Sequence, residues 1–89
     1  MRQDNLSIEG DGMPHVSIKL YPGRSEEQKK RLAEQIVKDV VALANCAEKS
    51  VSVAIEEITP EDWPEKVYRP EILGSWDKLY KQPGYNPLQ

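Results

Sequence analysis

The sequence has few of the features that stabilise a small domain covalently or attach it to a membrane. Its 89 residues include one cysteine, Cys46, so no disulfide can form within the chain, which fits a reducing compartment. No apolar run is long enough to cross a bilayer, and the first residues lack the pattern of a signal peptide. We therefore expect a cytoplasmic protein without a membrane partner.

Other absences exclude further classes of function. One histidine, His15, and one cysteine do not provide the ligand spacing of a metal site, and they are too far apart in sequence to suggest a thiol nucleophile. The net charge of −3 argues against a nucleic-acid partner, because phosphate recognition requires a basic surface. A chain of this length forms one small domain at most, with a small core.

Residues 1–13 differ in composition from the rest of the chain. They carry one basic and three acidic side chains, and Gly10 and Gly12 favour a break in regular structure. We divide the sequence into a polar N-terminal extension, residues 1–13, and a domain, residues 14–89. Codons for residues 9–12 (EGDG) must be purine-rich, like a bacterial ribosome-binding site, so we hypothesise that translation starts at Met13 and that Met1 is a mis-assigned start.

The first half of the domain has the pattern of a strand, a helix and a second strand. Apolar and polar residues alternate over 16–20. Ser25 and Gln28 have the spacing of a capping box, and the helical periodicity that follows ends near Asn45. Alternation returns over 51–58. The pattern predicts a βαβ unit with parallel strands.

The remaining residues predict short helical segments. Thr59 and the Pro-Glu-Asp after it indicate a single capped turn, Pro64 and Pro70 are expected to interrupt the chain, and a helix follows from about residue 72 to Pro83. Two strands rarely form a stable sheet alone. We therefore expect a second copy of the chain to complete a four-stranded sheet in a two-fold dimer.

Pro14 carries the main functional hypothesis. If Met13 is the start and is removed, the nitrogen of Pro14 becomes a free secondary amine, which can act as a general base. Inside a chain the same nitrogen belongs to an amide and has no usable basicity. The alternative interpretation is that Pro14 only begins the first strand, a position that proline tolerates.

The sequence resembles the 4-oxalocrotonate tautomerase family. The resemblance is carried by Met13-Pro14, by residues 23–29 (GRSEEQK), and by the second strand, residues 50–55 (SVSVAI). Residues 60–63 (PEDW) and 81–85 (KQPGY) are more similar to the longer, dimeric bacterial branch of the family. The resemblance implies a small α/β (α+β) fold, β-α-β with a short C-terminal helix, whose four-stranded sheet is completed by dimerisation.

The resemblance also implies an activity. Members of the family are cofactor-free keto–enol tautomerases that act on small 2-oxo or 2-hydroxy-dienoic and enolpyruvate-type acids. Pro14 would be the general base and acid, Arg24 would bind a substrate carboxylate or carbonyl, and Trp63 would form an aromatic wall. A cation and an apolar wall both disfavour the protonated amine, so both would lower the pKa of Pro14.

Two further residues are candidates for substrate binding. Ser52 stands where the hexameric branch has a second arginine, so polarisation of the far end of the substrate would fall to Ser52, to backbone amides or to a partner chain. This favours a small monocarboxylate over a dicarboxylate. His15 either lines the pocket or is a partly exposed strand residue, and Trp63 is either part of the site or part of the core. The second tryptophan, Trp76, is expected to pack in the core.

Residues 1–13 leave an alternative open. While they cap Pro14, the chain would be a catalytically silent module of the same fold that binds carboxylates through Arg24, or an oligomeric interaction domain. The sequence does not choose between these and the isomerase.

Overall fold

The computed structural model describes residues 12–89, which form two compact units. Residues 12–18 and 23–56 belong to the first unit, and residues 19–22 and 57–89 belong to the second. Among the residues described, no helix is long and apolar enough to cross a membrane.

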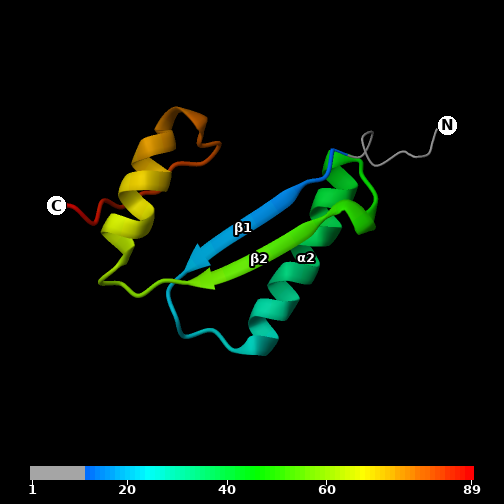
Figure 1. Ribbon diagram of the computed structural model, residues 1–89, viewed down its shortest axis with the longest axis horizontal. Helices are drawn as coiled ribbons and strands as arrows, with labels where there is room; N and C mark the ends of the chain where they lie inside the picture. The colour runs from blue at the N-terminus through cyan, green and yellow to red at the C-terminus, as the bar shows by residue number, and fades with distance from the viewer. Residues whose placement is uncertain (1–11) are drawn as a thin grey trace. The chain divides into compact units, whose positions relative to one another are not determined.

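The sheet has two parallel strands, β1 (His15–Leu20) and β2 (Ser52–Glu57), as Figure 1 shows. The backbone N–H of Ser52 donates to the carbonyl of Pro14 at 3.2 Å, and that of Ile58 donates to the carbonyl of Leu20 at 2.9 Å. These two bonds join residues with the same separation in sequence, which is the register of a parallel pair. The predicted βαβ arrangement is therefore confirmed.

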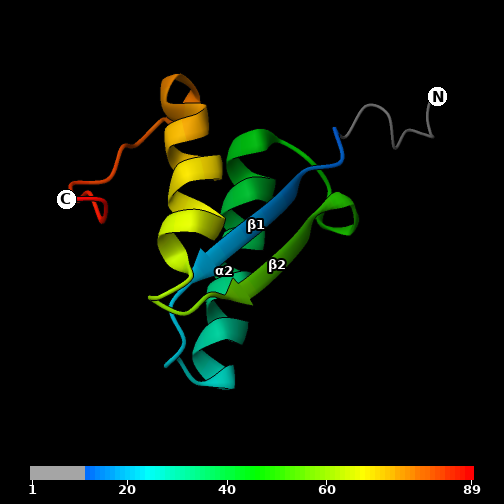
Figure 2. The same ribbon diagram turned by 60° about the vertical axis from the view of Figure 1, so that its left-hand side comes forward.

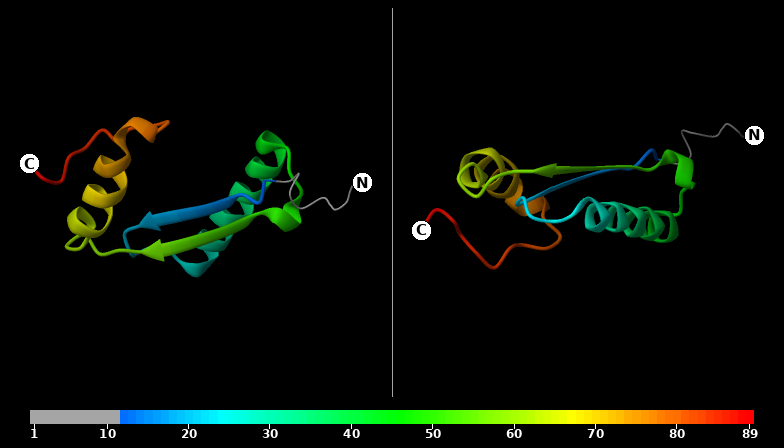
Figure 3. Two further views of the ribbon diagram at one scale, coloured as in Figure 1. Left: turned by 45° about the horizontal axis from the view of Figure 1, so that its top comes forward. Right: turned by 90° about the horizontal axis from the view of Figure 1, so that it is seen from below.

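Helix α2 (Glu26–Ala44) connects the two strands and covers one face of the sheet, as Figures 2 and 3 show. Its capping box is present: Gln28 N–H donates to Ser25 Oγ at 3.1 Å, and Ser25 N–H donates to Gln28 Oε1 at 2.9 Å. The helix ends at Asn45, which is left-handed, with φ 59° and ψ 59°. Both predicted ends of this helix are confirmed.

The strands alternate between a face toward α2 and an exposed face. Val16, Ile18, Val53 and Ile55 are partly buried. Val53 and Ile55 also line a groove together with residues of α2, which places their face against the helix. The opposite face carries the exposed side chains, which include those of His15, Ser17, Ser52 and Ala54.

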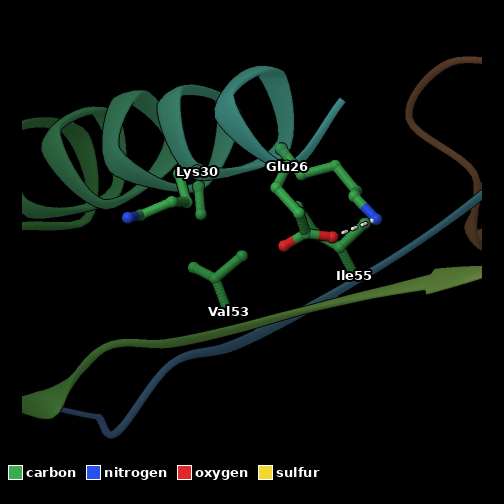
Figure 4. Close-up of a pocket in the computed structure, with 6 residues that line it drawn as sticks. Glu26, Lys30, Val53 and Ile55 are labelled. Carbon is green, nitrogen blue, oxygen red and sulfur yellow. Dashed lines mark ion pairs between the residues drawn. The ribbon is translucent and has the colours of Figure 1, made fainter. Parts of the chain in front are cut away.

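Much of the apolar surface of the first unit is not covered by residues 12–89. None of the side chains of α2 is fully buried; Leu32 is 39% exposed and Leu43 is 86% exposed. The groove between α2 and β2 has a volume of about 280 Å³ and is drawn in Figure 4. Its lining combines apolar side chains with a charged rim: Ala33, Val53 and Ile55, with Glu26, Lys29 and Lys30.

The second unit corrects the predicted effect of the prolines. In this unit the chain beyond β2 is helical in η2 (Pro64–Ile72) and η3 (Leu73–Lys78). A further short 3₁₀ turn, η1 (Glu48–Ser50), belongs to the first unit and precedes β2. The expected break at Pro70 is wrong, because η2 is a π-helix with Pro70 inside it. Pro70 donates no backbone hydrogen bond in either kind of helix, and in an α-helix its ring would also clash with the carbonyl four residues earlier.

Two other expectations for this unit are also corrected. The C-terminal helix ends at Leu79, which is extended, and so does not reach Pro83. Trp76, expected to pack in the core, is 39% exposed. The buried apolar side chains among residues 12–89 are instead those of Ile58, Val67 and Tyr68, all in the second unit.

The capping box gives a first testable prediction. Ser25→Ala removes the side-chain acceptor for one of the free N–H groups at the start of α2, so the free energy of unfolding should fall by about 1 kcal/mol. Urea unfolding at fixed chain concentration measures the change. Ser17→Ala makes the same chemical change on the exposed sheet face and serves as the control. Equal losses in the two variants would contradict this role of Ser25.

The charged rim of the groove gives a second prediction. The hydrogen bond and the positive charge of Lys29, whose Nζ lies 2.8 Å from Glu26 Oε2, lower the pKa of Glu26. A lowered pKa in the folded state stabilises the protein above the unfolded pKa, and this stabilisation is lost as the pH falls through the folded value. Lys29→Met should therefore raise the pKa of Glu26 toward its ordinary value, measured by NMR titration of the carboxyl carbon.

Lys30→Met is the matched control for that titration, because Lys30 acts on Glu26 through its charge alone and more weakly. It should move the pKa of Glu26 less than Lys29→Met does. The reverse order would contradict the assignment of the shift to Lys29.

Candidate active site

Pro14 lies immediately before β1, where its carbonyl is held by the backbone N–H of Ser52 at 3.2 Å. The chain reaches it through two residues with positive φ, Gly12 at 78° and Met13 at 49°. A non-glycine residue rarely adopts this region, so the backbone makes an uncommon turn directly before Pro14. In the chain as given, the nitrogen of Pro14 is bonded to Met13 and is an amide.

His15 and Ser52 meet at the same end of the sheet. The Nδ1 atom of His15 and the Oγ atom of Ser52 are 2.6 Å apart, on the exposed face away from α2. The register of the strands explains the contact, because the bond from Ser52 to Pro14 sets Ser52 beside His15. The structure therefore brings together three of the predicted site residues, Pro14, His15 and Ser52.

Arg24 lies beyond the other end of β1. It follows Gly23, whose φ of 130° requires glycine, and its side chain is exposed. Six strand residues at roughly 3.3 Å each separate the two ends of β1 by about 20 Å. Figure 1 shows the chain turning toward α2 at the arrowhead of β1, the end opposite to the start of the strand. Within one chain the structure does not bring Arg24 to Pro14.

Trp63 belongs to the second unit and lies in an aromatic cluster. Its ring makes an edge-to-face contact with Tyr21, with centroids 5.3 Å apart, and its Nε1–H donates to the hydroxyl of Tyr85 at 3.0 Å. The ring of Tyr85 packs on Tyr68 at 5.7 Å, and the hydroxyl of Tyr68 donates to the carbonyl of Tyr85 at 3.5 Å. The role of Trp63 as a wall of the site stays a prediction.

Tyr85 is a residue that the sequence reasoning left without a role. The bond from Trp63 gives the indole N–H the partner that a partly buried tryptophan needs. A signal was present in the sequence, since Tyr85 ends the segment 81–85 that carries part of the resemblance. Residues so distant in sequence could be paired only by the folded chain.

The residues around Pro14 do not take part in the groove of the first unit, and the described residues do not group into a metal site. None of the predicted site residues lines the groove between α2 and β2. Within residues 12–89, no three His, Cys, Asp or Glu side chains are grouped so that they could hold a metal ion. The groups that meet at the strand starts are the backbone of Pro14, the imidazole of His15 and the hydroxyl of Ser52.

Comparison with known proteins identifies the family. The family model described as "Tautomerase enzyme" matches residues 14–65, more than half of the chain. A "Probable tautomerase" from Xylella fastidiosa is 36% identical over 76 residues, which cover 85% of this chain and 93% of that protein. "Tautomerase PptA" from an Enterobacter species is 41% identical over 75 residues, covering 83% of this chain and 99% of that protein.

This chain is also similar to solved structures of 4-oxalocrotonate tautomerase homologues. The crystal structure of YwhB, a homologue of 4-oxalocrotonate tautomerase, is 35% identical with a TM-score of 0.51, covering 52% of this chain and 75% of that one. TomN, a 4-oxalocrotonate tautomerase homologue in the tomaymycin biosynthetic pathway, is 28% identical with a TM-score of 0.55, covering 56% of this chain and 77% of that one. The chain therefore belongs to the tautomerase family, and its activity is, in general terms, that of a tautomerase.

Proposed function

We propose that this protein is a cofactor-independent keto–enol tautomerase of small 2-oxo, 2-hydroxy-dienoic or enolpyruvate-type acids, with the nitrogen of Pro14 as general acid and base. One observation carries the proposal: the family match begins at Pro14, the residue that follows a methionine and immediately precedes β1.

The reaction needs one group that both accepts and returns a proton. The Pro14 nitrogen, as a free secondary amine, takes the proton of the enol hydroxyl while the oxygen becomes a carbonyl and the double bond shifts. The protonated amine then delivers a proton to the substrate carbon. Atoms and charge balance without an oxidant or a cofactor, so the protein has to supply only the base and the groups that hold the substrate.

The free nitrogen is the condition for this chemistry. A chain that begins at Met13 and loses that methionine provides it, and so does proteolytic removal of residues 1–13. While the peptide bond to Met13 remains, the proposal predicts a silent module with the same fold, because an amide nitrogen cannot accept the proton.

The proposed substrate has one carboxylate. Arg24 would bind it, because the planar guanidinium binds a carboxylate through two parallel hydrogen bonds. The opposite end of the substrate would meet His15 and Ser52, and neither of these offers the permanent charge of a second arginine. A monocarboxylate therefore fits these groups better than a dicarboxylate.

A homodimer would bring Arg24 of a second copy to Pro14. This part of the proposal is supported by the length of β1, which separates the two residues in one chain by about 20 Å. It is also supported by the two open edges of a two-stranded sheet and by the exposure of Leu32 and Leu43 on α2. A second copy could cover these surfaces and complete a four-stranded sheet.

The condition on the nitrogen gives a direct test. Ketonisation of an enolpyruvate should be fast for the chain that begins at Pro14, absent for the chain that begins at Met1, and strongly reduced for Pro14→Ala in the shorter chain. Loss of a proton-transfer group should cost about 10²–10⁴ in kcat. Mass spectrometry of the protein from its own cell identifies which amino terminus is present.

If the chain that begins at Met1 is as active as the one that begins at Pro14, the nitrogen of Pro14 is not the base. If neither converts the substrate faster than buffer does, the silent module is the better description.

The proposal that Pro14 of one copy and Arg24 of a second copy form one site gives a further test. Arg24→Ala should weaken the binding of a monocarboxylate substrate, with a fall of about tenfold to a hundredfold in kcat/KM, because a charged hydrogen bond contributes roughly 1.5–3 kcal/mol. Mixing Pro14→Ala chains with Arg24→Ala chains, after unfolding and refolding together, should restore part of the activity. Mixed dimers that stay inactive would show that Arg24 does not act across the interface.

A further inference from the structure

The side chains of His15 and Ser52 are joined by a short hydrogen bond. The two atoms that meet, Nδ1 and Oγ, lie 2.6 Å apart, a short distance for a neutral hydrogen bond. The other ring nitrogen of His15, Nε2, has no hydrogen-bond partner among residues 12–89. One end of the imidazole is therefore held, and the other is open on the exposed face of the sheet, on the residue that follows Pro14 in the sequence.

The bond to Ser52 can fix which nitrogen carries the proton. A neutral imidazole has one N–H and one acceptor nitrogen, and the partner of one nitrogen selects the state of the other. If the Ser52 hydroxyl donates to Nδ1, then Nε2 carries the hydrogen and becomes a donor. Ser52 has no other side-chain partner within residues 12–89, so its hydroxyl proton is available for this bond.

We propose that His15 is a catalytic hydrogen-bond donor, which contacts through Nε2–H the substrate oxygen that changes between enol and keto, and that Ser52 is the positioning residue that sets its tautomer. The proposal rests on the proposed function, because it assigns a role within the same reaction. His15 donates a hydrogen bond and transfers no proton; Pro14 still accepts the proton from the enol oxygen and returns one to carbon.

The charge on the substrate explains why such a donor is useful. As Pro14 removes the hydroxyl proton, negative charge develops on that oxygen, and a donor already aimed at it stabilises the transition state more than the ground state. A neutral imidazole can serve as this electrophile, as in triosephosphate isomerase. It stabilises an oxygen next to one carboxylate without adding the permanent charge that would favour a second carboxylate.

Two substitutions of His15 separate its two nitrogens. Asparagine places an amide near the position of Nδ1 and so keeps the contact with Ser52, whereas glutamine reaches the position of Nε2 and keeps the outward donor. In the chain that begins at Pro14, His15→Asn should lower kcat about 100-fold, the usual loss of one such donor, while His15→Gln should stay within about tenfold of the unchanged protein. Equal rates for the two variants would overturn the proposal.

The positioning role of Ser52 is read from a spectrum rather than from a rate. His15 is the one histidine of the sequence, so ¹⁵N NMR of histidine-labelled protein reports its two nitrogens without ambiguity. At alkaline pH, where imidazoles are neutral, the spectrum should show hydrogen on Nε2 and none on Nδ1. Ser52→Ala should mix the two tautomers and lower kcat, while Ser17→Ala, a serine on the same exposed face, should change neither.

The outcomes separate this inference from the proposed function. An active chain whose histidine carries its hydrogen on Nδ1 overturns the role of His15 and leaves Pro14 as the base. A chain beginning at Pro14 that has no activity overturns both proposals, whatever the spectrum shows.

Discussion

The structure of the first unit depends on the parallel pairing of β1 and β2 at the ends where the two strands begin. At this end the backbone N–H of Ser52 donates a hydrogen bond to the carbonyl of Pro14. A parallel pair cannot be joined by a hairpin, so the chain must travel back along the whole length of β1 before β2 can begin. Helix α2 makes this return with 19 residues, about 28 Å at 1.5 Å per residue, against roughly 20 Å for β1. The helix therefore allows Pro14, His15 and Ser52 to meet.

The same arrangement leaves the protein with apolar surface that one chain does not cover. A helix packed on a two-stranded sheet can bury one stripe of its surface. The apolar surface of α2 is wider than this stripe, because Leu32 and Leu43 remain exposed. The buried apolar side chains among residues 12–89 belong to the second unit, and α2 has no buried residue. A small domain that buries so little of its helix is of the kind that gains stability from association, which is why the proposed dimer concerns both stability and the site.

The sequence predicted the first unit well because its signals are local. The capping box at Ser25 and Gln28, the left-handed end at Asn45 and the alternation of the strands each depend on residues a few positions apart. The second unit was predicted less well. A proline normally ends an α-helix, whereas Pro70 lies inside a π-helix that also carries the buried Val67 and Tyr68, and the local sequence has no signal for such a helix.

The candidate site also contains residues that the sequence predicted and contacts that it did not. Pro14, His15 and Ser52 could be named from the sequence, and the parallel register that the pattern predicted is what joins them. The contact of Trp63 with Tyr85 could not be foreseen, because it joins residues across a loop with no periodic pattern. The separation of Arg24 from Pro14 was also not foreseen, since it depends on how far β1 extends.

Folding and the proposed catalysis place different demands on Pro14, and this separation makes both forms of the chain compatible with one structure. The sheet uses the carbonyl of Pro14, which accepts from Ser52, and makes no use of its nitrogen, because a proline within a chain has no N–H to donate. Releasing the nitrogen from the bond to Met13 therefore removes no hydrogen bond of the β1–β2 pair. It adds an ionisable amine at the strand start, on the residue that precedes His15 in the sequence. Under the proposed mechanism, a cap at this atom would therefore switch the chemistry while the βαβ unit remains folded.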